Sequence, residues 1–151
     1  MPGSAAFEDI AENFELLEDW EDRYRYLIDL GGQLAPLTDA ERVAANKVHG
    51  CASQVWLVTE ASGQADPVLR FRGDSDAHIV RGLIAVLLAI FSGRRGSEIA
   101  STDEKALLDR LHLTEHISTQ RSNGLRSMVA RIKQIGREAT LVHSEGEIVG
   151  R

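Results

Sequence analysis

Apolar residues follow a helical spacing near both ends of the chain and alternate over a short stretch in its middle. The first helical pattern places Phe7, Ile10, Ala11, Phe14 and Leu17 on one face. Residues spaced in this way form the buried stripe of an amphipathic helix. The sequence therefore predicts a helix that begins within the first ten residues and packs through its apolar face.

A second helical pattern runs through Trp20, Tyr24, Leu27 and Ile28. Asp19 is suited to cap its N-terminus, and Gly31-Gly32 is suited to end it. A long connection, residues 33–50, follows. Within it, Thr38 and Glu41 have the spacing of a capping box, which predicts one helical turn.

The middle of the chain has the composition of a β-hairpin. Residues 53–59 and 68–72 are rich in β-forming residues and partly alternate, and the turn Ser62-Gly63-Gln64 lies between them. Such a pattern predicts two antiparallel strands. Residues 47–49 could add a third short strand.

Three further helices are predicted after the hairpin. The first spans residues 77–91 and is apolar nearly all round, which indicates burial on most faces. Asp74, Ser75 and Asp76 are expected to cap it, and the glycine-containing segment 93–96 ends it. A second helix is predicted around residues 103–111.

The last predicted helix spans residues 123–138, with Ser122 or Asn123 as its cap. Residues 140–151 have little to bury and are expected to be frayed or loosely docked. The order of helices, hairpin and helices predicts an α+β fold, in which an antiparallel sheet of two or three strands packs against several helices. The length of 151 residues fits one domain, residues 1–139, with a short tail, residues 140–151.

Charge and composition exclude several classes of protein. The net charge is −6, and eight of the 23 acidic residues lie within residues 1–22, which contain no Lys or Arg. This acidic start and the lack of a basic stripe argue against nucleic-acid binding. The longest apolar stretch, residues 82–91, is about half as long as a bilayer span. One cysteine cannot form an internal disulfide, and no secretion signal is visible, so we expect a reducing cytoplasm.

Cys51 is the strongest candidate for chemistry. It lies between the small residues Gly50 and Ala52, directly before the predicted hairpin, where a turn would present it to another protein. The alternative is a buried, inert thiol, since free cysteine is often buried. A reactive thiol needs its thiolate form. His49, two residues away, and Arg121, from a distant segment, are the groups that could favour it.

Other groups of polar residues have a simpler interpretation. His112 and His116 are four residues apart, which would place both on one helical face. A zinc site needs three or four ligands, so we interpret them as ordinary histidines and predict no metal.

Several segments around Cys51 resemble the SufE/CsdE family of sulfur acceptors. The first is His49-Gly50-Cys51-Ala52-Ser53-Gln54-Val55-Trp56. Two further blocks follow in the same order as in the family: Gly73-Asp74-Ser75-Asp76-Ala77 and Arg121-Ser122-Asn123-Gly124-Leu125. Trp20-Glu21-Asp22-Arg23-Tyr24 also matches, so that the resemblance extends over about residues 7–138.

The resemblance implies that Cys51 accepts sulfur as a persulfide from a pyridoxal-phosphate cysteine desulfurase of the SufS/CsdA type and stimulates that enzyme. The sulfur would then pass to an iron–sulfur scaffold complex. The chain itself would act as a carrier rather than an enzyme, would need no cofactor, and would be a monomer or a homodimer. The residues expected to support the site or contact the partner are His49, Gly50, Ser53, Gln54, Asp74, Ser75, Asp76 and Arg121.

Three other functions remain open from the sequence. A U-type iron–sulfur scaffold has a similar build, but a cluster normally needs several thiolates. A stand-alone thiol peroxidase or hydrolase needs a base or a second thiol beside the cysteine. An adaptor protein with an inert cysteine would keep its full function after Cys51→Ser.

Overall fold

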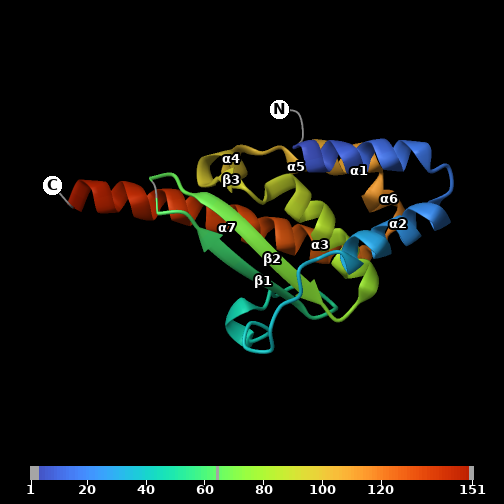
Figure 1. Ribbon diagram of the computed structural model, residues 1–151, viewed down its shortest axis with the longest axis horizontal. Helices are drawn as coiled ribbons and strands as arrows, with labels where there is room; N and C mark the ends of the chain where they lie inside the picture. Colours follow the sequence, from blue (N-terminus) through green and yellow to red (C-terminus); the bar gives the residue numbers. More distant parts are fainter. Residues whose placement is uncertain (1–3, 64, 150–151) are drawn as a thin grey trace.

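The computed structural model describes residues 4–63 and 65–149, with side chains as far as residue 141. Its elements, in chain order, are α1 (Ala5–Leu16), α2 (Trp20–Gly32), a 3-10 helix η1 (Ala44–Asn46), β1 (Val55–Ala61), β2 (Val68–Ser75), α3 (His78–Phe91), β3 (Arg94–Arg95), α4 (Gly96–Ser101), α5 (Glu104–Leu111), α6 (Leu113–His116) and α7 (Thr119–Val149). Figure 1 shows the hairpin on one side of a group of helices, which confirms the predicted α+β fold.

The described sheet has the strand order β1-β2-β3 and is antiparallel throughout. Val55 pairs with Ser75 at one end of the hairpin and Ala61 with Leu69 at the other. The third strand is not the one suggested from the sequence. Lys47 makes only an isolated bridge to Trp56, whereas Arg94–Arg95 pairs with the start of β2. This strand forms only through pairing between segments that are distant in the sequence, so no local sequence pattern predicts it.

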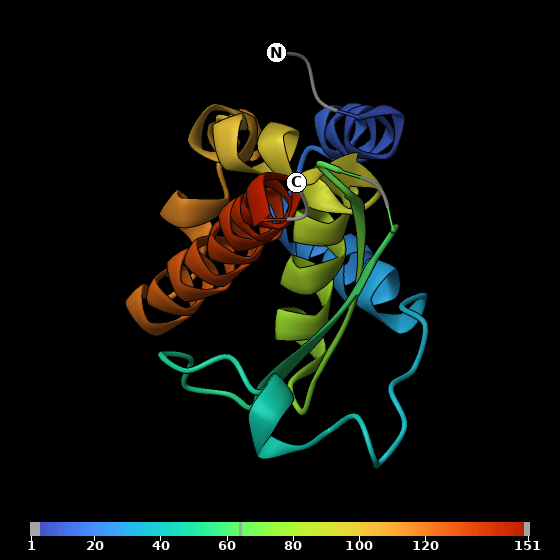
Figure 2. The same ribbon diagram turned by 90° about the vertical axis from the view of Figure 1, so that its left-hand side faces the viewer.

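Helix α3 is the centre of the core and packs against both α2 and the hairpin (Figures 1 and 2). Eight of its 14 residues are buried, as its apolar composition predicts. The helices α2 and α3 approach closely because glycines meet at their crossing. A Cβ atom on Gly82 would lie 2.3 Å from the carbonyl oxygen of Leu27, so no larger residue fits.

The two predicted N-terminal helices are confirmed. In α1, Phe7, Ile10, Ala11 and Phe14 are buried, and the Ser4 hydroxyl caps the helix by accepting a hydrogen bond of 3.1 Å from the Phe7 N–H. Asp19 stands at the N-cap position of α2, but its side chain makes no capping hydrogen bond.

Residues 33–50 are attached to β2 by ion pairs. Thr38 and Glu41 form the reciprocal hydrogen bonds of a capping box, and the N–H groups of Glu41 and Arg42 both donate to the Thr38 carbonyl. This is the single capped turn that was predicted, and η1 follows it. The Glu41 carboxylate also accepts hydrogen bonds from the guanidinium of Arg72. These bonds are the main reason why the pKa of Glu41 is lowered to about 2. The connection that leads to Cys51 is therefore held against the sheet.

Two predicted helix caps are wrong. Asp74 and Ser75 belong to the end of β2, and α3 begins at His78 without a side-chain cap. Ser122 and Asn123 lie inside α7, which begins at Thr119. Residues that favour caps also occur within strands and helices when tertiary contacts fix the backbone, so the local preference was overridden.

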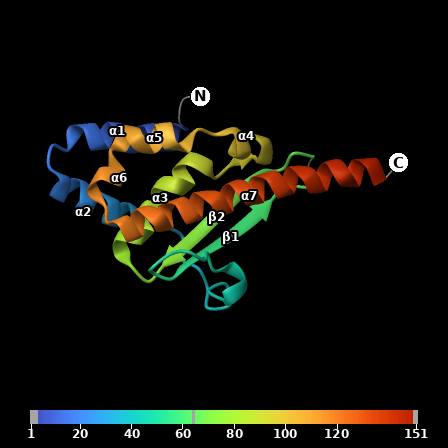
Figure 3. The ribbon, with the colours of Figure 1, turned by 180° about the vertical axis from the view of Figure 1, so that it is seen from behind.

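Helix α7 is longer than predicted at both ends. It continues past Glu138 to Val149, so the described part of the tail is helical, and its last turns project beyond the rest of the molecule (Figures 1 and 3). Within the described chain, no helix combines the length and apolarity needed to span a membrane.

Candidate functional site

A short loop, residues 49–54, carries Cys51. Its base is closed by the bridge between Lys47 and Trp56 and by a hydrogen bond of 2.8 Å from the Val48 N–H to the Val55 carbonyl. Gly50, directly before the cysteine, has a φ of +92°, a conformation that glycine adopts without strain. These constraints turn the half-buried Cys51 side chain toward α7.

Two glycine contacts allow the loop to lie directly on α7. Cys51 Sγ is 3.6 Å from the Gly124 carbonyl oxygen, to which the thiol donates. A Cβ on Gly124 would lie 3.5 Å from Sγ, and a Cβ on Gly50 would lie 2.5 Å from Ser127 Oγ. The glycines before Cys51 and opposite it therefore set how closely the thiol approaches the helix.

A small cavity of about 20 Å³ opens beside the thiol. It is lined by Cys51, Ala52, Ser53, Val80, Leu83, Gln120, Arg121, Gly124 and Met128. Val80 and Leu83 come from α3 and Met128 from α7, so one wall is apolar, while Gln120 and Arg121 add a polar edge. The volume is close to that of one additional atom.

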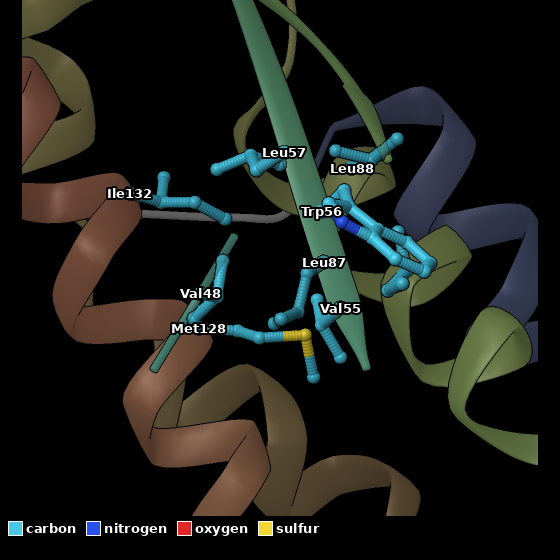
Figure 4. Close-up of a pocket in the computed structure, with 9 residues that line it drawn as sticks. Val48, Val55, Trp56, Leu57, Leu87, Leu88, Met128 and Ile132 are labelled. Carbon is cyan, nitrogen blue, oxygen red and sulfur yellow. The ribbon is translucent and has the colours of Figure 1, made fainter. Parts of the chain in front are cut away.

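A second cavity lies deeper, beneath β1, and Figure 4 shows its apolar side chains. It measures about 10 Å³ and shares Met128 with the cavity at the thiol. The surroundings of Cys51 are thus continuous with the hydrophobic core rather than with a polar active site.

Burial raises the pKa of the Cys51 thiol, because the apolar walls disfavour the charged thiolate. The Gly124 carbonyl acts in the same direction, since it accepts a hydrogen bond from the neutral thiol and presents a partial negative charge to the anion. Both effects favour the neutral thiol over the thiolate in this conformation.

Most of the residues predicted to support the site do lie around Cys51. Ser53 and Arg121 line the cavity. The Asp76 carboxylate accepts a hydrogen bond of 3.0 Å from the Gln54 N–H, which joins the end of the cysteine loop to the segment before α3. His49 is different, because its exposed side chain does not line the cavity.

Asp74 and Ser75 do not line the cavity at the thiol, and they lie at the end of β2. The Asp74 carboxylate lies 3.2 Å from Arg42 Nη1 and 3.2 Å from Arg81 Nε, which are ion-pair distances, although Arg81 Nε lacks hydrogen-bond geometry. Ser75 is buried and its hydroxyl accepts from the Ala77 N–H. These contacts fix the end of β2, which pairs with the first residues after the cysteine loop.

The sequence did not identify the walls of the cavity. Val80, Leu83 and Met128 have the spacing of ordinary core residues, so no local signal distinguishes them. Gly124 lies in the segment that resembles the SufE family, and its position after Arg121 was the available signal.

The shared helical face expected for His112 and His116 is not formed. His112 adopts a left-handed conformation between α5 and α6, so it does not share a helical face with His116. Among the described residues, no group of three or more His, Cys, Asp or Glu is arranged to hold a metal ion.

Comparisons with known proteins agree with this architecture. A solution structure of a hypothetical protein from Thermus thermophilus has a similar fold, with a TM-score of 0.71 over 91% of this chain and 98% of that chain, at 18% identity. An uncharacterized SufE-like protein of Rhizobium meliloti is 56% identical over 85% of this chain and 92% of its own length. A second such protein, from Rhizobium etli, is 54% identical over 86% of this chain and 88% of its own length. Residues 8–136 match the SufE Fe-S metabolism associated domain, and the chain belongs to the SufE family.

Proposed function

We propose that this protein accepts sulfur on Cys51 as a persulfide from a pyridoxal-phosphate cysteine desulfurase, stimulates that enzyme, and passes the sulfur on for iron–sulfur cluster assembly. The observation that carries the proposal is the position of the chain's one thiol beside a cavity the size of a single atom. Membership of a family associated with iron–sulfur metabolism supports the proposed destination of the sulfur.

The transfer is an exchange between sulfur atoms. The Cys51 thiolate attacks the terminal sulfur of the persulfide on the desulfurase, a new S–S bond forms at Cys51, and the S–S bond on the enzyme breaks. The enzyme's cysteine leaves as a thiolate and accepts a proton. No electrons enter or leave, so this chain needs no redox cofactor, and the pyridoxal phosphate belongs to the partner.

The resting geometry supports storage rather than attack. Against Gly124 the neutral thiol is favoured over the thiolate that must attack, and the side chain is only partly exposed to a partner. The loop must therefore move Cys51 outward to react and return it afterwards. After transfer, the outer sulfur would occupy the cavity between Cys51 and Met128, where Val80, Leu83 and Met128 would shield it from water and reductants on its apolar side.

The proposed setting follows from the same chemistry. A persulfide carrier works in a reducing compartment, for which we propose the cytoplasm, and its partners are the desulfurase and a downstream scaffold complex. Neither nucleic acid nor a membrane has a role in this transfer.

Mass spectrometry of the intact protein tests the proposal. After incubation with the desulfurase and free cysteine, the wild-type protein should gain the mass of one sulfur atom, and a reductant should remove it. Because Cys51 is the only thiol, no competing site can take up the label.

Cys51→Ser is the matched control, since it nearly preserves size while the hydroxyl stays protonated at neutral pH. The variant should take up no sulfur and should not stimulate the desulfurase. Full stimulation by this variant would contradict the acceptor mechanism. Partial stimulation without uptake would show that docking alone alters the enzyme.

A further inference from the structure

Helices α5 and α7 lie on the side of the molecule away from the hairpin (Figures 2 and 3). Side chains of both helices line a large groove between them. Its volume is about 760 Å³, far above the cavity at Cys51, and it falls in the range of sites that bind ligands or peptides. Leu108 from α5 and Leu125 and Val129 from α7, which are 7%, 2% and 8% exposed, form an apolar floor that is continuous with the core.

The rim of the groove is positively charged although the chain is acidic. Lys105, Arg126 and Arg137 lie on the rim, opposed by Asp109. The remaining charged lining residues neutralise each other, because Lys133 pairs with Glu104 at 2.7 Å. The net positive rim is therefore a local feature in a chain of net charge −6.

The groove and the cysteine cavity use neighbouring faces of α7. Gly124 and Met128 line the cavity, whereas Leu125 and Val129, one position further along, line the groove. A protein held in the groove would thus be anchored beside Cys51 without covering the thiol.

We propose that the groove between α5 and α7 is a docking site for an acidic amphipathic helix of a partner protein that exchanges sulfur with this chain. The apolar floor would receive residues at helical spacing, and the basic rim would pair with flanking carboxylates. From Ser122 to Arg137 the groove extends for about 22 Å along α7, the length of about four helical turns. The binding site stands on its own geometry, while the identity of the partner rests on the proposed function.

A synthetic peptide tests the site directly. The probe is an amphipathic helix of about four turns, with leucines at helical spacing and glutamates elsewhere, titrated into the full-length 15N-labelled protein. We expect amide shift changes along α5 and the α7 face of the groove. A matched peptide with lysines in place of the glutamates should bind at least about tenfold more weakly, because the rim would repel it.

Paired variants separate the groove from general attraction to α7. Arg126→Glu together with Arg137→Glu reverses two rim charges and should weaken the acidic peptide by at least about tenfold. Arg131→Glu reverses an exposed charge on the same helix outside the groove and should change affinity less than about twofold.

Three results would overturn the proposal: equal binding of both peptides, equal affinity in the double variant and the wild type, or no binding at millimolar peptide. Self-association of the wild type that the double variant abolishes would assign the groove to a second copy instead. Because no desulfurase or sulfur is present, a failure here leaves sulfur uptake on Cys51 untouched, and a failure of uptake leaves this result standing.

Discussion

The half-buried position of Cys51 affects the protonation of its thiol. Its pKa is raised because the thiolate would lose hydration among Val80, Leu83 and Met128. In the free protein, a smaller fraction of Cys51 is thiolate at neutral pH than for a free cysteine, whose pKa is about 8.5. The rate of alkylation by iodoacetamide should therefore rise with pH through a midpoint above that value.

The same protein unfolded in urea supplies the control, because its exposed thiol should titrate near the value of free cysteine. A raised pKa in the folded state favours the neutral thiol, so this contribution to stability is complete below the unfolded pKa and is lost as pH rises toward the folded pKa. A midpoint at or below the free-cysteine value would contradict burial of the thiol.

Gly124 and Gly50, the two glycines at the site, differ in whether they can be replaced by alanine without strain. Gly124→Ala adds a Cβ at ordinary contact distance, 3.5 Å from Sγ, within a helix. The fold should be kept or stabilised by up to about 1 kcal/mol, but the added methyl group narrows the space beside the sulfur. We expect a shorter persulfide lifetime, measured by the decay of the added sulfur mass in mild reductant.

Gly50→Ala is the contrasting variant. Its Cβ would lie 2.5 Å from Ser127 Oγ, and alanine disfavours a φ of +92°. It should destabilise the protein by about 1–2 kcal/mol and change the position of the loop. If both variants gave the same persulfide lifetime as the wild type, the cavity would not shelter the outer sulfur.

At the scale of the elements, the crossing of α2 and α3 organises the core. A Cβ on Gly31 would lie 2.6 Å from the Gly82 backbone nitrogen, so Gly31→Ala must separate the two helices. We expect a loss of about 1–3 kcal/mol in the free energy of unfolding, measured by urea denaturation.

The next residue in the chain is the matched control. Nothing lies within 4 Å of a Cβ built on Gly32, at the last position of α2. Gly32→Ala should change the free energy of unfolding by less than about 1 kcal/mol. Similar losses in both variants would show that helix propensity, rather than the close crossing, sets the cost.

The elements differ in how far the sequence predicts them. The amphipathic α1 could be predicted because its apolar residues repeat at helical spacing over several turns. The core helix α3 could be predicted from a long apolar segment that ends at glycines. The first turn of α7 was missed because residues 119–122 are polar and resemble a loop. Strand β3, two residues long, exists only through its pairing with β2, which no window of local sequence contains.

The same distinction applies to the site. Cys51 could be singled out as the candidate because its neighbours in the sequence are small and the segment resembles that of the SufE family. Its cavity could not, since Val80 and Met128 come from helices far apart in the chain and have the spacing of core residues. The groove between α5 and α7 depends on which helix faces remain uncovered, which only the packing of the whole molecule decides.

At the scale of the whole molecule, the cysteine loop and the end of β2 form one continuous surface. The Gln54 backbone N–H donates a hydrogen bond to the Asp76 carboxylate, and β1 pairs with β2 up to Ser75. A desulfurase that withdraws Cys51 from its cavity must contact this surface. We therefore expect residues 47–53 and 73–76 to gain protection from amide hydrogen exchange when the desulfurase binds.

Exchange in these two segments distinguishes docking at Cys51 from docking elsewhere. The end of the hairpin at Ala61 and Val68 lies opposite the cysteine loop and serves as the internal reference. Its exchange should stay unchanged, because a partner that reaches Cys51 does not need to contact it. Cys51→Ser should show the same protection, since the contact surface is intact while transfer is blocked. Protection confined to other segments would show that the desulfurase binds away from Cys51. The cysteine loop would then have to reach the enzyme's persulfide without itself being bound by the enzyme.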